Sequence, residues 1–145
     1  MSFEAVVNQT PLADGLKAGL QAVKNNERSK IQCADTRQLN GSVDIDSLLK
    51  KQYPRSNRWD YLVGYRDCAV FIEVHPAMTS EVSTMLNKLE WLHSWLRDHA
   101  PLLGKQGASF HWVSTDGVSI PKKSKQYRQL AQKNLLPQRV LHLPV

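Results

Sequence analysis

The stretch WDYLVGYRDCAVFIEVH, residues 59–75, places two acids and a histidine within an otherwise apolar pattern. Side chains alternate between the two faces of a strand, so a hairpin with a two-residue loop at Arg66-Asp67 puts Asp60 directly opposite Glu73. Opposed residues have Cβ atoms about 4.5–5.5 Å apart, and two carboxylates that close repel unless a cation lies between them or one takes up a proton. The pattern therefore indicates a site for a divalent cation.

Magnesium suits such a site, because carboxylate and carbonyl oxygens together with several waters are its usual ligands. His75 follows Glu73 by two residues and shares its face, so it could position or deprotonate a metal-bound water. In the structural alternative, Glu73 and His75 form an ordinary polar pair on a solvent-facing side of the hairpin. Asp60 would then bond to a nearby arginine, Arg58 or Arg66. The residues alone leave both interpretations open.

The elements that must position these residues follow from hydrophobic periodicity. The runs RWDYLVGY and AVFIEVH predict an antiparallel hairpin at about 58–75. A stripe of apolar residues spaced three and four apart predicts a helix over 81–99, after Pro76 has ended the second strand of the hairpin. The other expected elements are a first helix from Thr10-Pro11 to about residues 25–30, strands at 42–46 and 109–114, a helix over the basic C-terminal segment and a last strand in RVLHLPV.

This order predicts an α/β (α+β) single-domain sandwich with a central mixed sheet flanked by helices. With 145 residues and 41% hydrophobic content, we expect one domain over 1–145, with its core over 10–115 and a basic helix and last strand over 119–145. No run of about 18 apolar residues occurs, so no membrane span is expected. Cys33 and Cys68 are expected to be buried, reduced thiols, and together with the absence of an export signal they indicate a cytoplasmic protein.

The order of elements, with Asp on the second strand and Glu-x-His on the third, resembles the PD-(D/E)XK nuclease superfamily over about residues 10–115. The resemblance implies that Asp60 and Glu73 bind Mg²⁺ and that Val74 offers its carbonyl to the same ion. His75 would occupy the position of the catalytic lysine. The chain departs from the motif in that histidine and in Trp59, which replaces the proline.

Some members of the superfamily take the basic residue from the following helix, and Lys88 is the candidate here, with a solvated helix lysine as the alternative. By the same resemblance, Glu27 could be the additional acid that some members carry near the end of the first helix. The string RWDYLVGY…FIEVHPA is also similar to small bacterial proteins, a likeness that implies no chemistry. The function expected from the resemblance is a Mg²⁺-dependent endonuclease acting on nucleic acid.

The positive charge of the chain is concentrated near its C-terminus. The formal net charge is +6, and residues 121–139 contain several lysines and arginines but no acid. This segment is interpreted as a phosphate-contacting surface for nucleic acid, with a solvated helix face as the alternative. The residues assigned to that contact are Lys122, Lys123, Lys125 and Arg128.

Two tryptophans on the predicted long helix suggest a second function class. Trp91 lies nearly opposite the apolar stripe and Trp95 flanks it, so another part of the chain or a partner must cover them. The segment 121–145, a homodimer and a protein partner are the alternatives. The chain would then be a non-catalytic protein-interaction or oligomerisation module on a similar α/β scaffold.

Overall fold

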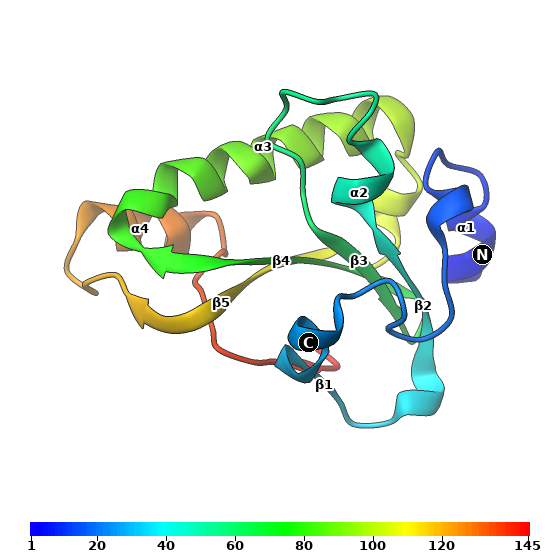
Figure 1. Cartoon of the computed structure of the whole chain (residues 1–145), viewed down its shortest axis with the longest axis horizontal. Coiled ribbons are helices and arrows are strands. Elements are labelled where there is room, and N and C mark those ends of the chain that lie inside the picture. The colour runs from blue at the N-terminus through cyan, green and yellow to red at the C-terminus, as the bar shows by residue number, and fades with distance from the viewer.

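Four strands form the central sheet in the spatial order β2-β3-β4-β5 (Figure 1). The computed structural model describes residues 1–145, in which β2 spans Leu39–Asp44, β3 Tyr61–Tyr65, β4 Cys68–Met78 and β5 Ser109–Ser119. Strands β2, β3 and β4 are mutually antiparallel, whereas β5 runs parallel to β4. The mixed sheet and its flanking helices confirm the predicted α+β class.

The β3–β4 hairpin has the predicted two-residue loop. Arg66 and Asp67 both have positive φ, 50° and 63°, as a turn matching the twist of a two-stranded ribbon requires. The β3–β4 ladder pairs Tyr65 with Cys68 and Tyr61 with Ile72, and continuing this register places Asp60 opposite Glu73. The backbone N–H of Asp67 donates to Asn40 Oδ1 at 2.8 Å, which ties the loop to β2.

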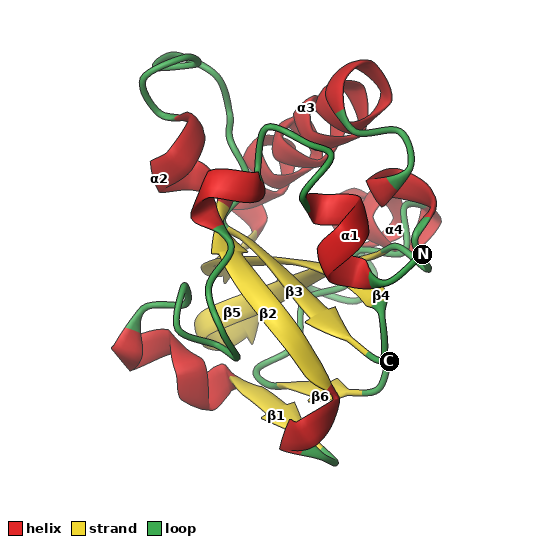
Figure 2. Cartoon of the chain, turned by 90° about the vertical axis from the view of Figure 1, so that its right-hand side faces the viewer, coloured by secondary structure: helices red, strands yellow, loops and turns green.

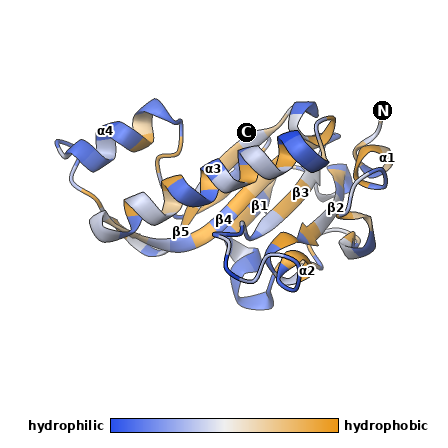
Figure 3. Ribbon diagram, turned by 90° about the horizontal axis from the view of Figure 1, so that it is seen from above, coloured by the Kyte–Doolittle hydropathy of each residue, from blue (hydrophilic) through white to orange (hydrophobic).

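Helix α3 (Val82–His99) makes the crossover between the parallel strands β4 and β5 and lies across one face of the sheet (Figure 3). It confirms the predicted helix over 81–99. The short helices α1 (Phe3–Val7) and α2 (Ile45–Leu49) pack on the same face (Figure 2). The helices and the sheet bury the larger core of 24 residues, to which α3 contributes Val82, Met85, Leu89, Leu92, Trp95 and Leu96.

The opposite face of the sheet is covered by a second, two-stranded parallel sheet. Its strands are β1 (Ile31–Cys33) and β6 (Leu141–Leu143), which lie beneath the main sheet in Figure 2. Together they bury a core of 11 residues that includes Tyr61 and Val63 of β3. The predicted last strand is therefore confirmed, and it pairs with β1 rather than with the central sheet.

The predicted first helix is wrong. Residues 8–24 contain only the 3-10 turn η1 (Ala13–Gly15), and the 3-10 helix η2 (Asn25–Lys30) follows. Gly19 has a φ of +51°, and Lys17 exchanges two backbone hydrogen bonds of 2.9 Å with Ser42. Leu12 lies in the larger core and Val23 in the second. The helical spacing of these apolar residues therefore arises from two separate cores and not from one helix face.

Pro76 does not end the second strand of the hairpin, because β4 continues to Met78. The pairing of β4 with β5 shifts between His75 and Ala77, and proline is tolerated in a sheet at such an irregularity. The expectation of buried thiols is also wrong, since Cys68 is exposed and Cys33 half-buried, although both are free.

Helix α4 (Lys125–Gln132) confirms the helix predicted over the basic segment. Ser124 caps it by accepting a hydrogen bond from Tyr127 N. None of the helices has the length and apolar content that crossing a membrane requires. The remaining 3-10 helices are η3 (Thr36–Gln38), η4 (Thr79–Glu81) and η5 (Leu103–Lys105).

Candidate functional site

Asp60 and Glu73 lie side by side where β3 begins, on the sheet face that α3 covers. Asp60 N donates to Glu73 Oε1 at 2.9 Å, and Val74 N donates to Asp60 Oδ2 at 3.0 Å. Each carboxylate thus accepts a backbone N–H from the other strand. Glu73 is 1% exposed, one of only three buried polar residues in the chain. The structure therefore brings the two predicted acids together.

Lys88 reaches this pair from α3. Its Nζ lies 3.1 Å from Glu73 Oε2 and donates to Arg58 O at 2.9 Å. The lysine lies one turn from Met85 and Leu92, at the border of the buried stripe, so its stem follows the helix toward the sheet. Lys88 is consequently a member of the carboxylate cluster and not a solvated surface lysine.

His75 lies between two glutamates. Its Nδ1 is 3.5 Å from Glu73 Oε2, and its Nε2 is 3.6 Å from Glu81 Oε1. The interaction with Glu73 raises the pKa of His75, although burial opposes the shift. Trp112 Nε1 donates to the backbone carbonyl of His75 at 2.9 Å and holds β4 at this position. Neutral pH therefore favours an imidazolium here more than in an exposed histidine.

Asp60 is the acid whose charge is least compensated. Burial, followed by the neighbouring Glu73, raises its pKa from 3.8 to about 8. The hydrogen bond from Val74 N and the charge of Lys88 oppose this shift without cancelling it. Asp60 makes no ion pair, and the sequence-based alternative that pairs it with an arginine is wrong, because Arg58 pairs with Asp46 instead. The cluster is thus short of positive charge at Asp60.

Glu27 approaches the cluster from the opposite side of β3. Tyr61 Oη donates to Glu27 Oε1 at 2.5 Å and accepts from Lys24 N at 3.3 Å. Burial and this hydrogen bond raise the pKa of Tyr61, and the charge of Glu27 adds to the upward shift of the pKa of Asp60. Glu27 belongs to η2 rather than to a long first helix. No hydrogen bond or ion pair joins Glu27 to Asp60 or Glu73, so its role as an additional acid stays a prediction.

Sequence reasoning missed Glu81 and Tyr61 as neighbours of the cluster. Glu81 fits an ordinary first-turn acid of α3, and Tyr61 fits a core-facing strand residue. The sequence held only a weak signal for either residue. Glu81 lies six residues after His75, and Tyr61 directly follows Asp60.

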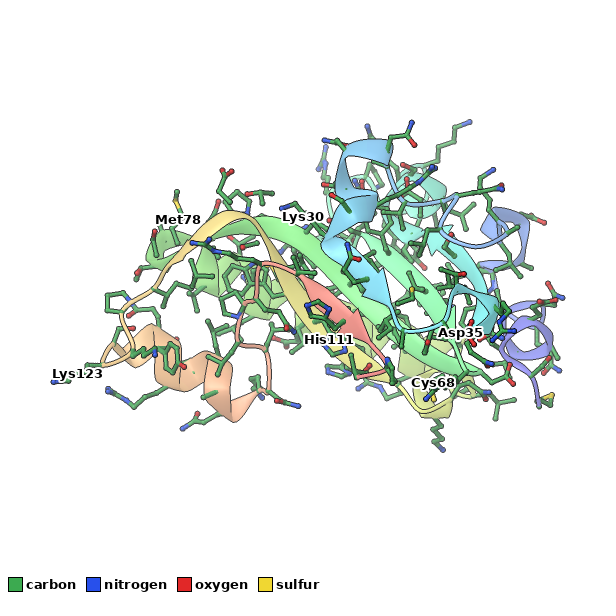
Figure 4. The ribbon with its side chains drawn as sticks, turned by 90° about the horizontal axis from the view of Figure 1, so that it is seen from below. Lys30, Asp35, Cys68, Met78, His111 and Lys123 are labelled. Carbon is green, nitrogen blue, oxygen red and sulfur yellow. The ribbon has the colours of Figure 1, made fainter.

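The four basic residues assigned to nucleic-acid contact surround the start of α4, and three are lysines exposed to solvent. Lys123 lies at the opposite end of the molecule from Asp35 and Cys68 (Figure 4). Arg128 Nη1 donates to Lys123 O at 3.1 Å. No hydrogen bond or ion pair joins this group to the carboxylate cluster. The group consists of Lys122, Lys123, Lys125 and Arg128.

The chain itself covers the tryptophans of α3. Trp95 is 4% exposed, and Trp91 is half-buried with its ring 5.9 Å from that of Tyr53. The covering segment is the loop after α2 and not the segment 121–145, which packs through Leu130 on another flank of α3. Burial of Trp95 removes the main reason for expecting a partner at these indoles.

Comparison of the chain with protein-family models, with curated proteins and with solved structures found no match in any of the three. No group of three or more His, Cys, Asp or Glu side chains is arranged to hold a metal ion. The geometry of the cluster of Asp60, Glu73, Lys88 and His75 is therefore the basis for a functional proposal.

Proposed function

We propose that this protein is a Mg²⁺-dependent nuclease-like protein that acts on nucleic acid. The observation that carries the proposal is the convergence of Asp60, Glu73 and Lys88, with Lys88 Nζ 3.1 Å from Glu73 Oε2 and Asp60 uncompensated. Two carboxylates and a lysine at the end of a β-hairpin are the groups that the resemblance to the PD-(D/E)XK superfamily implies.

The topology supports the proposal. A strand, a β-hairpin, a crossover helix and a parallel strand follow one another as β2, β3–β4, α3 and β5, which is the order that the resemblance describes. Lys88 from α3 supplies the amine that His75 lacks at the motif position. The departures are Trp59 in place of proline and the missing long first helix.

The carboxylate and carbonyl oxygens of the cluster are the kinds of ligand that Mg²⁺ takes. Asp60 Oδ1 makes no hydrogen bond, and the N–H of Val74 points toward Asp60, so its carbonyl lies on the same side of β4. Asp60, Glu73 and the Val74 carbonyl would hold the ion, which agrees with the few protein ligands that Mg²⁺ takes. A bound Mg²⁺ would polarise a phosphoryl oxygen and lower the pKa of a bound water.

The basic residues of the cluster have distinct roles in this proposal. Lys88 places a positive charge beside Glu73, where it can stabilise negative charge that develops on a phosphate. The raised pKa of His75 makes it better suited to balance Glu73 and Glu81 than to accept a proton from water. We therefore assign His75 to charge balance and positioning, and not to the deprotonation of a metal-bound water.

Cleavage of supercoiled plasmid and of single-stranded DNA with Mg²⁺ or Mn²⁺ tests the proposal. Activity is expected from the native chain and should fall at least about 100-fold in Asp60→Asn, Glu73→Gln and Lys88→Met. Asp98→Asn is the matched control, since it neutralises an exposed carboxylate of α3. Circular dichroism verifies that each variant folds. Cleavage that never appears, or persists unchanged in Asp60→Asn and Glu73→Gln, refutes the proposal.

A non-catalytic module is the second candidate. It is favoured because both carboxylate oxygens of Glu73 already have partners within the chain. Its Oε1 accepts Asp60 N, and its Oε2 faces Lys88 and His75, so the cluster already ties β3, β4 and α3 together. Titration calorimetry with Mn²⁺ separates the candidates. Binding that Asp60→Asn abolishes supports the nuclease-like site, whereas no heat in the native chain favours the structural tie.

A further inference from the structure

Three adjoining surface cavities border the flank of α3 that faces away from Lys88. All three are lined by His93, and their volumes are about 300, 600 and 170 Å³. They lie between the turn that follows α3 and the C-terminal end of α4, and they meet at His93 as one groove. We call it the His93 groove; its charged and aromatic lining is His93, Arg97, Lys105, Lys133, Glu90, Phe110 and His111.

Unpaired positive charge dominates the groove. Lys105 and Lys133 are exposed and make no ion pair, and Arg97 has only the adjacent Asp98, at 3.7 Å between two exposed side chains. Such an exposed pair contributes little. Glu90 is the one acid in the lining. The groove is therefore complementary to an anionic ligand.

Lys105 and Lys133, which we call the cationic rims of the groove, lie on anchored backbone. Lys133 is the C-cap of α4, where Leu135 N donates to Leu130 O at 2.9 Å and both leucines are buried. Lys105 ends η5, which fully buried Leu103 anchors to the larger core. Because both lysines follow segments anchored in the larger core, the spacing of their backbones is set by the fold.

The floor of the groove is aromatic. The His93 ring lies 4.5 Å from that of Phe110, which stacks on Phe71 at 5.1 Å. Burial and the charge of Lys133 lower the pKa of His93, and burial lowers the pKa of His111. The lowered pKa of His93 favours its neutral form, a flat ring with one donor and one acceptor.

We propose that the His93 groove binds a single strand of nucleic acid. Arg97, Lys105 and Lys133 would contact its phosphates, and His93 would contact a base. Cationic rims along an aromatic floor are the combination that holds single strands, and three linked cavities fit a chain of phosphates better than an isolated anion. The inference goes beyond the proposed nuclease function and does not depend on it, because α3 lies between the groove and Asp60.

Fluorescence anisotropy of a labelled single strand of about 12 nucleotides, in EDTA so that no divalent cation contributes, tests the inference. The double variant Arg97→Glu, Lys133→Glu should bind at least about tenfold more weakly, with a salt slope lower by about 2. The matched control is Lys50→Glu, Lys51→Glu, which changes the net charge equally at exposed positions after α2. We expect that control to change affinity less than about twofold.

A second control reverses Lys17 and Lys24, two exposed lysines before η2. An equal loss of affinity in either control overturns the inference in favour of general electrostatic attraction. Displacement of the strand by inorganic phosphate or polyglutamate at matched ionic strength, as effective as by unlabelled strand, also overturns it. Asp60→Asn should bind the strand as tightly as the native chain, so failure of the nuclease proposal and failure of this one are distinguishable.

Discussion

Replacing Asp60 by asparagine should stabilise the protein at neutral pH. The pKa of Asp60 rises from 3.8 to about 8 on folding, so the folded chain resists ionisation of a group that is ionised in the unfolded chain at pH 7. At 1.36 kcal/mol per pKa unit over the ~3 units between 3.8 and 7, the cost is at most about 4 kcal/mol. Because the side chain keeps some solvent contact, we expect about 1–3 kcal/mol. The asparagine side chain retains an oxygen that can accept from Val74 N.

The sign of the pH dependence follows from the raised pKa. Below about pH 4 the carboxyl is protonated in both states, so the native chain and the asparagine variant should be equally stable with respect to this group. Between about pH 4 and 8 the native chain loses stability as pH rises, and the variant does not. The difference in unfolding free energy should therefore grow through this window and level off above about pH 8.

Urea unfolding at pH 5, 6, 7 and 8, followed by tryptophan fluorescence, measures this difference. Mn²⁺ at saturating concentration should reverse the order at pH 7 by stabilising only the chain that keeps the carboxylate. The view that Asp60 is uncompensated is refuted if the difference in unfolding free energy does not vary with pH. It is also refuted if the native chain becomes more stable relative to the variant as pH rises.

Three further changes test the packing around the cluster. Lys88→Met should lower the free energy of unfolding by about 3–5 kcal/mol, because it leaves Glu73 buried without its main partner. Adding Glu73→Gln should recover most of this loss, which urea unfolding of the single and double variants measures. Trp95→Ala should cost about 3–5 kcal/mol and half-buried Trp91→Ala clearly less, which thermal unfolding of the two variants compares. Gly64→Ala should lower the free energy of unfolding by about 1–3 kcal/mol, because a Cβ there would stand 2.5 Å from the ring of Phe3. Adding Phe3→Leu should recover part of this loss in the same assay if the clash is its cause.

The sequence was sufficient for the hairpin and α3 because both depend on local periodicity. Alternation of side chains in β3 and β4 and a loop that tolerates positive φ fixed the register that opposes Asp60 to Glu73. The apolar stripe of α3 also contained a usable signal for Lys88, since the lysine lies one turn from two buried residues.

The first 30 residues were mispredicted because local spacing does not show which core a side chain enters. Leu12 and Val23 have helical spacing yet lie in different cores. Tyr61 and Glu81 joined the cluster through contacts between separate elements, which no periodicity encodes. The cover over Trp91 was missed for the same reason, since Tyr53 lies on an irregular loop.

The pairing of β1 with β6 joins Ile31 to Leu141, two positions far apart in the sequence. Until residues 141–143 are in place, Tyr61 and Val63 on the inner face of β3 lack part of their cover. Pairings this distant in sequence slow folding, and the exposed sheet face is prone to aggregate in the meantime. Tyr61 also holds Glu27, so the surroundings of the carboxylate cluster depend on this distant pairing.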